Sequence, residues 1–218
     1  TYPIKSPQHG GQKRLSAIVN ELKNAGMKVK HIAVFHPSHY HDYSKDDIPI
    51  RGSSVHKINK SPFTGDVECG ELIFKDTYIK NKIVKLINVF KPDVIHLEQA
   101  FAYLGLKPLL EEMSIQPKLV FGSQNIEYEM KEEMLNSLNY DPENIKSIVD
   151  KIKQVEVQLI KDAKIISAVS TNDAKKLERM GAEKCVIAPN GIYESHANLD
   201  DIIYWKDIFK KIGVNKIA

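Results

Sequence analysis

The sequence of 218 residues has few of the features that mark disulfide-stabilised, secreted or membrane-spanning proteins. It contains two cysteines, Cys69 and Cys185, which are far apart and have no CxxC spacing. We therefore expect free, buried thiols and a reducing, cytoplasmic compartment. No apolar run approaches the roughly 18 residues that a membrane helix needs. No signal peptide is visible, but this absence carries less weight because a gene can begin further upstream.

The sequence also lacks a strong excess of either charge. Its 31 lysines and arginines against 28 acidic residues give a net charge of +3, which does not predict a nucleic-acid-binding surface. A local basic run at Lys23, Lys28, Lys30 and His31 leaves open a peripheral contact with the inner face of a membrane. Such a run is more often a solvated face. With 42% hydrophobic residues, the chain can bury one substantial core.

What the chain does contain is an alternation of strand and helix patterns. Apolar residues at helical spacing predict helices over 11–26, 77–91, 102–113 with an interruption near Pro108, 127–138, 142–160 and 171–180. Short apolar runs predict strands over 29–35, 93–97, 118–121, 164–169 and 185–188. This order predicts an α/β fold, with a Rossmann-like, doubly wound and mostly parallel sheet.

A glycine pair, Gly10 and Gly11, stands at the start of the first predicted helix. Two glycines allow a tight turn and leave the first N–H groups of the helix uncovered, which favours a bound anion such as phosphate. Lys13 and Arg14 are close enough in sequence to assist. A lone glycine pair is also explained by a simple turn.

Polar residues follow every predicted strand, at 36–41, 98–99, 123–125, 170–173 and 190–191. Ligands in open parallel sheets bind where strands end, so we expect these segments to lie along one edge with the glycine pair. The loop 36–41 contains three histidines, but Pro37 breaks their spacing and nothing nearby completes four zinc ligands. We expect a loop at the rim of the cleft and no metal.

Several residues along this edge have two interpretations. His96 is either a core histidine within a strand or a cleft residue near the strand's end. Glu98 and Glu127 suit acid–base chemistry, yet Glu127 equally suits the first turn of a helix. Ser170, with Asp173 three residues later, has the spacing of a helix cap. Asn190 and Gly191 form a turn by propensity alone.

Taken together, these segments resemble the N-terminal domain of GT-B glycosyltransferases, the retaining family 4 group. The resemblance runs from about residue 7 to 192. It rests on Gly10-Gly11-x-x-Arg14, Lys91-Pro92-Asp93-Val94-Ile95-His96, Gln124-Asn125-Ile126-Glu127 and, most specifically, the stretch from Ser170 to Pro189-Asn190-Gly191.

The resemblance implies an enzyme of two Rossmann-like lobes that transfers a sugar from a nucleoside-diphosphate-sugar to a glycan or lipid-linked acceptor. It implies retention of configuration, a role in cell-envelope glycan synthesis, and no cofactor or metal. Residues 1–192 would be the acceptor-side lobe, and 193–218 a connection, with a short helix at Trp205, Ile208 and Phe209, to a donor-binding lobe absent here. No strand fits before His9, so we expect a fragment cut at both ends and inactive alone.

The resemblance also implies roles for individual residues. Gly10, Gly11, Lys13, Arg14, Asn190 and Gly191 would face the donor phosphates; Gln124, Asn125 and Glu127 the reacting sugar; His96, Glu98 and Ser170 the acceptor. Gln124 stands where many relatives have histidine, and an amide can orient a hydroxyl but cannot shuttle a proton. Tyr193 replaces a common aspartate.

Two other classes remain as alternatives. One is a non-catalytic sugar- or partner-binding module on the same scaffold. The other is a nucleotide- or dinucleotide-dependent enzyme, which the sequence does not favour because a full GxGxxG pattern and a suitably spaced ribose-binding acid are missing.

Overall fold

The structure is a computed structural model that describes residues 2–52, 55, 64–138, 141–191, 203, 207–208 and 210–211. Four strands form its main sheet: β3 (Val94–Leu97), β4 (Lys118–Ser123), β5 (Ile165–Ala168) and β6 (Cys185–Ile187). They pair in chain order, and every pair is parallel. All four strands therefore end at the same edge.

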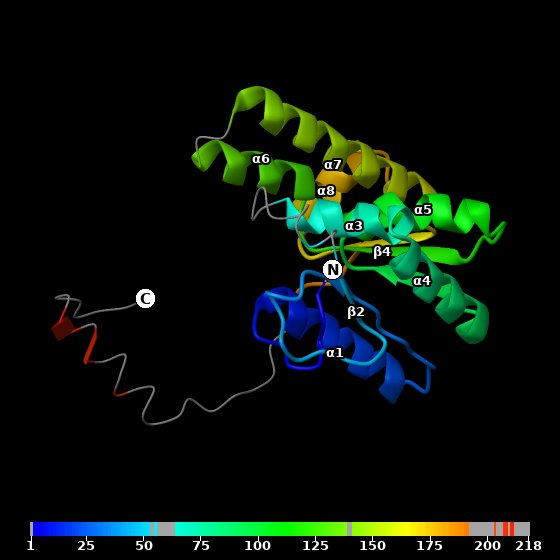
Figure 1. Ribbon diagram of the computed structural model, residues 1–218. Coiled ribbons are helices and arrows are strands. Elements are labelled where there is room, and N and C mark those ends of the chain that lie inside the picture. The colour runs from blue at the N-terminus through cyan, green and yellow to red at the C-terminus, as the bar shows by residue number, and fades with distance from the viewer. Residues whose placement is uncertain are drawn as a thin grey trace.

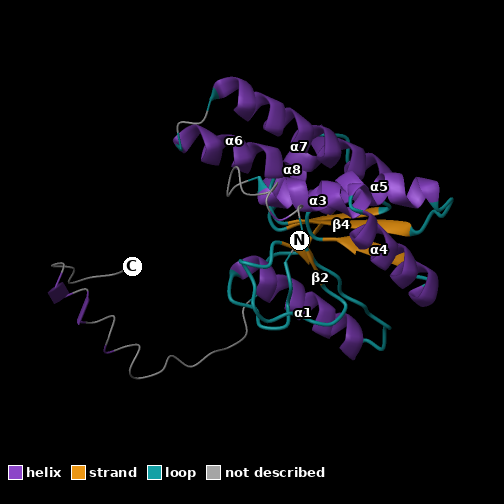
Figure 2. Cartoon of the chain, viewed as in Figure 1, coloured by secondary structure: helices purple, strands orange, loops and turns teal. Residues whose placement is uncertain are grey.

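Helices connect these strands and cover the sheet on both faces. A 3₁₀ turn (Ala100–Ala102) and α5 (Tyr103–Glu112) join β3 to β4, α6 (Glu127–Ser137) and α7 (Pro142–Asp162) join β4 to β5, and α8 (Thr171–Arg179) joins β5 to β6. In Figure 1, α5 and α7 lie on one side of β4 and α1 (Gly10–Asn24) lies on the other. Figure 2 shows the strands between these two helical layers. The predicted α/β, Rossmann-like fold is confirmed.

A second, smaller ladder joins β1 (Val34–Phe35) and β2 (Ile48–Pro49), again in parallel. The predicted strand at 29–35 is thus too long. One reason lies at Ala33: its N–H donates to the buried carboxylate of Asp47 instead of to a strand, while its carbonyl accepts the N–H of Ile48 in β2. Burial raises the pKa of Asp47, but hydrogen bonds from His31 and from the N–H groups of Ser44 and Ala33 outweigh it and hold the pKa low.

Two helices depart from the prediction. Helix α3 (Gly65–Lys75), which precedes α4 (Thr77–Phe90), was not predicted. Pro108 does not interrupt α5, which continues through it. Proline removes one backbone hydrogen bond there, and burial of neighbouring Leu106, Leu109 and Leu110 keeps the helix intact. The predicted end of α1 is confirmed: Gly26 has a φ of 82°, as expected for the residue after a helix end.

The core lies between the sheet and the layer of α3, α5 and α7. Phe121 in β4 and Ile166 in β5 pack there against Leu109 of α5 and Leu159 of α7, all at most 3% exposed. Every residue of the predicted apolar stripe of α7 is buried except half-buried Ile148. The stripe also contains a charged residue, Glu156, which is 0% exposed. The expected short helix at 205–209 lies largely outside the described residues.

Candidate functional site

An ion pair between Arg14 and Glu98 joins α1 to the residue that follows β3. Arg14 Nε lies 3.0 Å from Glu98 Oε2, and the two side chains are 9% and 5% exposed. Burial raises the pKa of Glu98, but His96 and Arg14 outweigh it, so its pKa lies below the ordinary value. Glu98 is therefore an anionic acceptor at neutral pH.

Arg14 also reaches the segment that follows β6. Its Nη1 donates to the backbone oxygen of Ala188 and, at 2.8 Å, to Asn190 Oδ1. One guanidinium thus connects α1 with the ends of two strands. Three N–H groups of Arg14 are engaged by Glu98, Ala188 and Asn190, so Arg14 holds parts of the protein together. Its assistance to a bound phosphate stays a prediction.

Gln124, which follows β4, completes the cluster. Its Nε2 donates to Glu98 Oε2 at 3.2 Å and to the hydroxyl of Tyr2 at 2.9 Å. Since an ionised carboxylate can only accept, the NH₂ group of Gln124 must face Glu98, and its carbonyl oxygen is left facing the glycine turn. A Cβ built on Gly11 would lie 3.2 Å from that oxygen.

Two glycines provide the space for this cluster. A Cβ on Gly11 would overlap the hydroxyl of Tyr2 and lie 2.9 Å from its Cζ, whereas a Cβ on Gly10 would meet nothing. A Cβ on Gly122, in β4, would overlap Glu98 Oε1. Both positions need the absence of a side chain because a neighbour occupies its place.

His96 lies on the face of β3 beside Gly122. Its Nε2 is 3.0 Å from Glu98 Oε1, and its side chain is 30% exposed. It is therefore not a core histidine; the interpretation as a cleft residue is the one that agrees with the structure.

The start of α1 is only partly uncovered. His9 caps it: His9 Nδ1 accepts the N–H of Gln12, and the Gln12 side chain accepts the N–H of His9 in return. Among the described residues, the N–H groups of Gly10 and Gly11 have no hydrogen-bond partner. Lys13 is exposed beside them. Two N–H groups and one cation thus remain available to an anion.

Glu127 does not reach the surface of this cluster. It is 2% exposed and stands next to Glu156, whose two oxygens accept the N–H groups of Glu127 and Tyr128 and so cap α6. Burial and the charge of Glu156 raise the pKa of Glu127 to about 7. The predicted contact of Glu127 with a sugar is thus not available in this conformation, whereas Asn125, two residues earlier, is exposed.

Ser170 has a structural role at the start of α8. Its Oγ accepts the N–H of Asp173 and donates to Asp173 Oδ2 at 2.6 Å. The helix-cap interpretation is confirmed, and the suggestion that Ser170 faces an acceptor has no support in this geometry. Gly191 is exposed at the end of the described segment.

The sequence did not point to four residues of this region: Tyr2, Asp66, Gly122 and Glu156. Glu156 had a signal, because it is a charge within an apolar helical stripe. Asp66 is in the first turn of α3, which was itself not predicted. For Tyr2 and Gly122 no local pattern exists, since their neighbours are distant in sequence.

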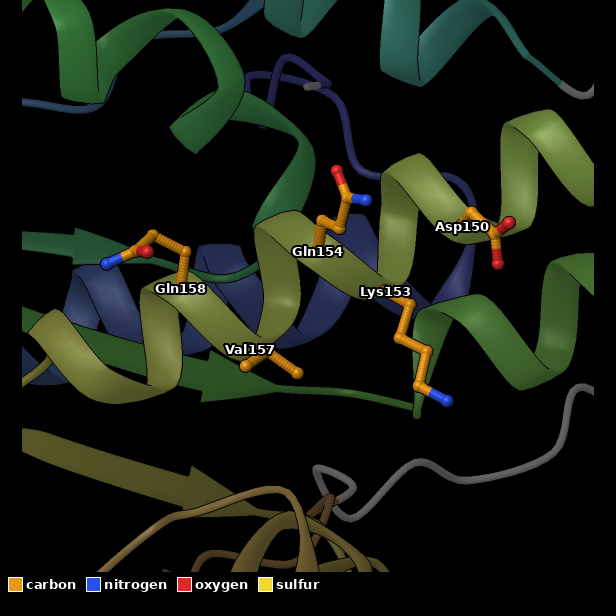
Figure 3. A pocket seen from close by; sticks show the side chains of 5 residues that line it. All are labelled: Asp150, Lys153, Gln154, Val157 and Gln158. Atoms are coloured by element: carbon orange, nitrogen blue, oxygen red, sulfur yellow. The ribbon is translucent and has the colours of Figure 1, made fainter.

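A hollow on the outer face of α7 is unrelated to this cluster. Its lining comes from that helix alone, with Asp150, Lys153, Gln154, Val157 and Gln158 at successive turns (Figure 3). Asp150 pairs with Lys146, and Gln158 donates to Asp162. We interpret it as an ordinary solvated helix face.

The structure adds no support for a membrane contact at the basic run or for a metal site at the histidine loop. Lys30 pairs with Asp46 at 3.1 Å, and His31 lies 3.4 Å from Asp47, which offsets part of the positive charge. Within the described ranges, no three histidine, cysteine or acidic side chains are grouped as a metal site would require. None of the described helices combines the length and apolarity needed to cross a membrane.

Comparisons of the chain with protein-family models, with curated proteins and with solved structures found no match. The function is therefore argued from the site alone.

Proposed function

We propose that this chain is the acceptor-side lobe of a retaining GT-B glycosyltransferase, which moves a sugar from a nucleoside-diphosphate-sugar to a glycan or lipid-linked acceptor. One observation carries the proposal: the glycine turn of α1 and the residues after β3, β4 and β6 form one polar cluster, joined through Arg14, Glu98 and Gln124. Ligands of open parallel sheets bind at this edge.

Each part of the cluster suits one part of such a substrate. The N–H groups of Gly10 and Gly11, with Lys13, would stabilise the charge on a departing pyrophosphate without a metal. The carbonyl oxygen of Gln124 would accept a sugar hydroxyl. Arg14 and Glu98 would act as positioning residues, because Arg14 donates to Asn190 and Glu98 accepts from Gln124.

The proposal places the donor nucleotide mainly in a second lobe, so residues 1–218 should bind pyrophosphate weakly and transfer no sugar. The experiment is a titration of the ¹⁵N-labelled chain with inorganic pyrophosphate, followed through the amide resonances of Gly10 and Gly11. Those two resonances should shift, and the shifts should diminish in Lys13→Ala. The matched control is Lys23→Ala, at the other end of α1.

Absence of any shift at Gly10 and Gly11 would contradict the phosphate role. Turnover of a nucleotide-sugar by these residues alone would contradict the division between two lobes. The Nε resonance of Arg14 should respond less than the two amides, because this N–H already donates to Glu98.

A further inference from the structure

A row of aromatic rings extends from the glycine turn to the loop that follows β1. The rings of Tyr2 and His9 have centroids 4.9 Å apart at 90°, and those of His9 and Tyr40 are 6.3 Å apart. His39 continues the row, 6.4 Å from Tyr40. We call His9, Tyr40 and His39 the aromatic row.

The aromatic row is fixed from behind and open to solvent in front. Tyr40 packs edge-on against Phe35, which is 1% exposed in β1, and its hydroxyl lies 3.4 Å from His9 Nε2. His9 and His39 are exposed, and Tyr40 is half-buried. The rings thus have a rigid support and a surface that a ligand can reach.

A carboxylate accompanies the aromatic row. Asp66 is in the first turn of α3, which packs against β1, and its charge favours the protonated forms of Tyr2, His9 and Tyr40. Burial raises the pKa of Tyr40 to about 12, and Asp66 adds to that rise. Burial lowers the pKa of His9, against the opposing effect of Asp66. Asp66 is itself 3.6 Å from Lys131, and its side chain is 40% exposed.

These properties favour one ligand chemistry. A carboxylate accepts hydroxyl groups and repels phosphate, and aromatic rings offer apolar faces with polar edges. Burial lowers the pKa of His9 and so disfavours its charged form, which weakens the attraction of this ring for an anion. A neutral ring with hydroxyl groups, namely a sugar, satisfies both features, whereas a phosphorylated nucleoside would meet Asp66 unfavourably.

We propose that the aromatic row and Asp66 bind the acceptor as a carbohydrate ring, next to the glycine turn that faces the donor. This inference rests on the proposed function and names the acceptor class of the same site. It gives a role to the loop 36–41, whose histidines belong to no metal-binding group among the described residues. Tyr40 supplies the central ring, and Asp66 accepts hydroxyl protons.

The experiment is saturation-transfer NMR on the 218-residue chain. The probes are the methyl glycosides of glucose, mannose and galactose, and N-acetylglucosamine. Two comparison ligands are sorbitol, an open-chain polyol, and uridine monophosphate, a phosphorylated nucleoside. At least one pyranoside should bind, and Tyr40→Leu and Asp66→Asn should each weaken it about fivefold or more. His39→Ala, a change at an exposed ring, tests the row without disturbing the core.

Matched controls are Tyr78→Leu on α4 and Asp150→Asn on α7, which should leave binding unchanged. Thermal melting of each variant checks that it is folded. The inference would be overturned if the Tyr40, His39 and Asp66 variants bound the pyranoside as well as the unsubstituted chain does. It would also be overturned if the chain preferred uridine monophosphate or sorbitol to every pyranoside. The pyrophosphate titration is independent of these outcomes, so loss of one result with retention of the other separates this inference from the proposed function.

Discussion

Arg14 and Glu98 are 84 residues apart in sequence, yet they form an ion pair of 3.0 Å that fixes the first helix to the edge of the main sheet. Its two side chains are nearly buried, so neither can recover hydration when the other is removed. This pair determines where the glycine turn lies relative to the strand ends.

Replacing Arg14 with methionine should destabilise the chain by about 3 kcal/mol, because Glu98 would keep a buried charge without its arginine partner. Urea unfolding at pH 7 measures this. Lys146→Met is the matched control: its partner Asp150 is one helical turn away on an exposed face, so the loss should be much smaller. Equal effects of the two substitutions would show that the Arg14 pair contributes no more than a surface pair.

The buried carboxyls at the start of α6 should make stability fall as pH rises. Burial raises the pKa of both Glu127 and Glu156 to about 7. An unfolded glutamate loses its proton near pH 4.3, so between about pH 4.5 and 7 the folded state binds more protons and its stability decreases with pH. Glu156 accepts two N–H groups and favours ionisation, so we assign the retained proton to Glu127.

Glu127→Gln should therefore flatten this dependence and raise stability at pH 8 by about 1 to 3 kcal/mol. Glu156→Gln should lower stability at every pH, because an amide can accept only one of the two N–H groups. Urea unfolding at pH 5, 6, 7 and 8 distinguishes them, with exposed Glu132→Gln on the same helix as control. A pH profile of Glu127→Gln that matches the unsubstituted chain would refute the assignment.

The glycine pair should respond unequally to alanine. A Cβ at position 11 would overlap the hydroxyl of Tyr2, whereas a Cβ at position 10 meets nothing. Gly11→Ala should displace Tyr2 from Gln124 and cost about 1 to 3 kcal/mol, while Gly10→Ala should be nearly neutral. Thermal melting gives the stabilities, and the pyrophosphate titration should fail only in Gly11→Ala. Identical melting temperatures for the two variants would mean that Tyr2 does not occupy this space.

The fold could be predicted from the sequence because its signals are local. Apolar spacing gave α7 and the four main strands, and the glycine at 26 marked a helix end. The predicted strand at 29–35 proved too long, and at Ala33 the carboxylate of Asp47, 14 residues later, takes the N–H that a strand partner would accept. Local periodicity carries no information about such a side chain.

The site could be predicted only as a set of segments. Parallel strands end at one edge of the sheet, so the sequence could predict that the glycine turn meets Glu98, Gln124 and Asn190. How the side chains pair there does not follow: Arg14, which the sequence suggested as an aid to phosphate binding, also binds Glu98 and Asn190. Pairing between distant side chains decides this, and no spacing rule encodes it.

The variant Gln124→Glu tests directly whether Glu98 is ionised and faces the side chain at position 124. The substituted carboxylate would replace a donor that lies 3.2 Å from Glu98 Oε2, so two anions would face each other and the bond to Tyr2 would weaken. At pH 8 the variant should be less stable than the unsubstituted chain by about 2 kcal/mol, and the difference should shrink toward pH 5 as one carboxyl takes up a proton. Urea unfolding across this range, with exposed Gln154→Glu on α7 as control, provides the measurement. A difference that does not change with pH would indicate that Gln124 is oriented away from Glu98, and that its carbonyl oxygen is not the group presented to a ligand.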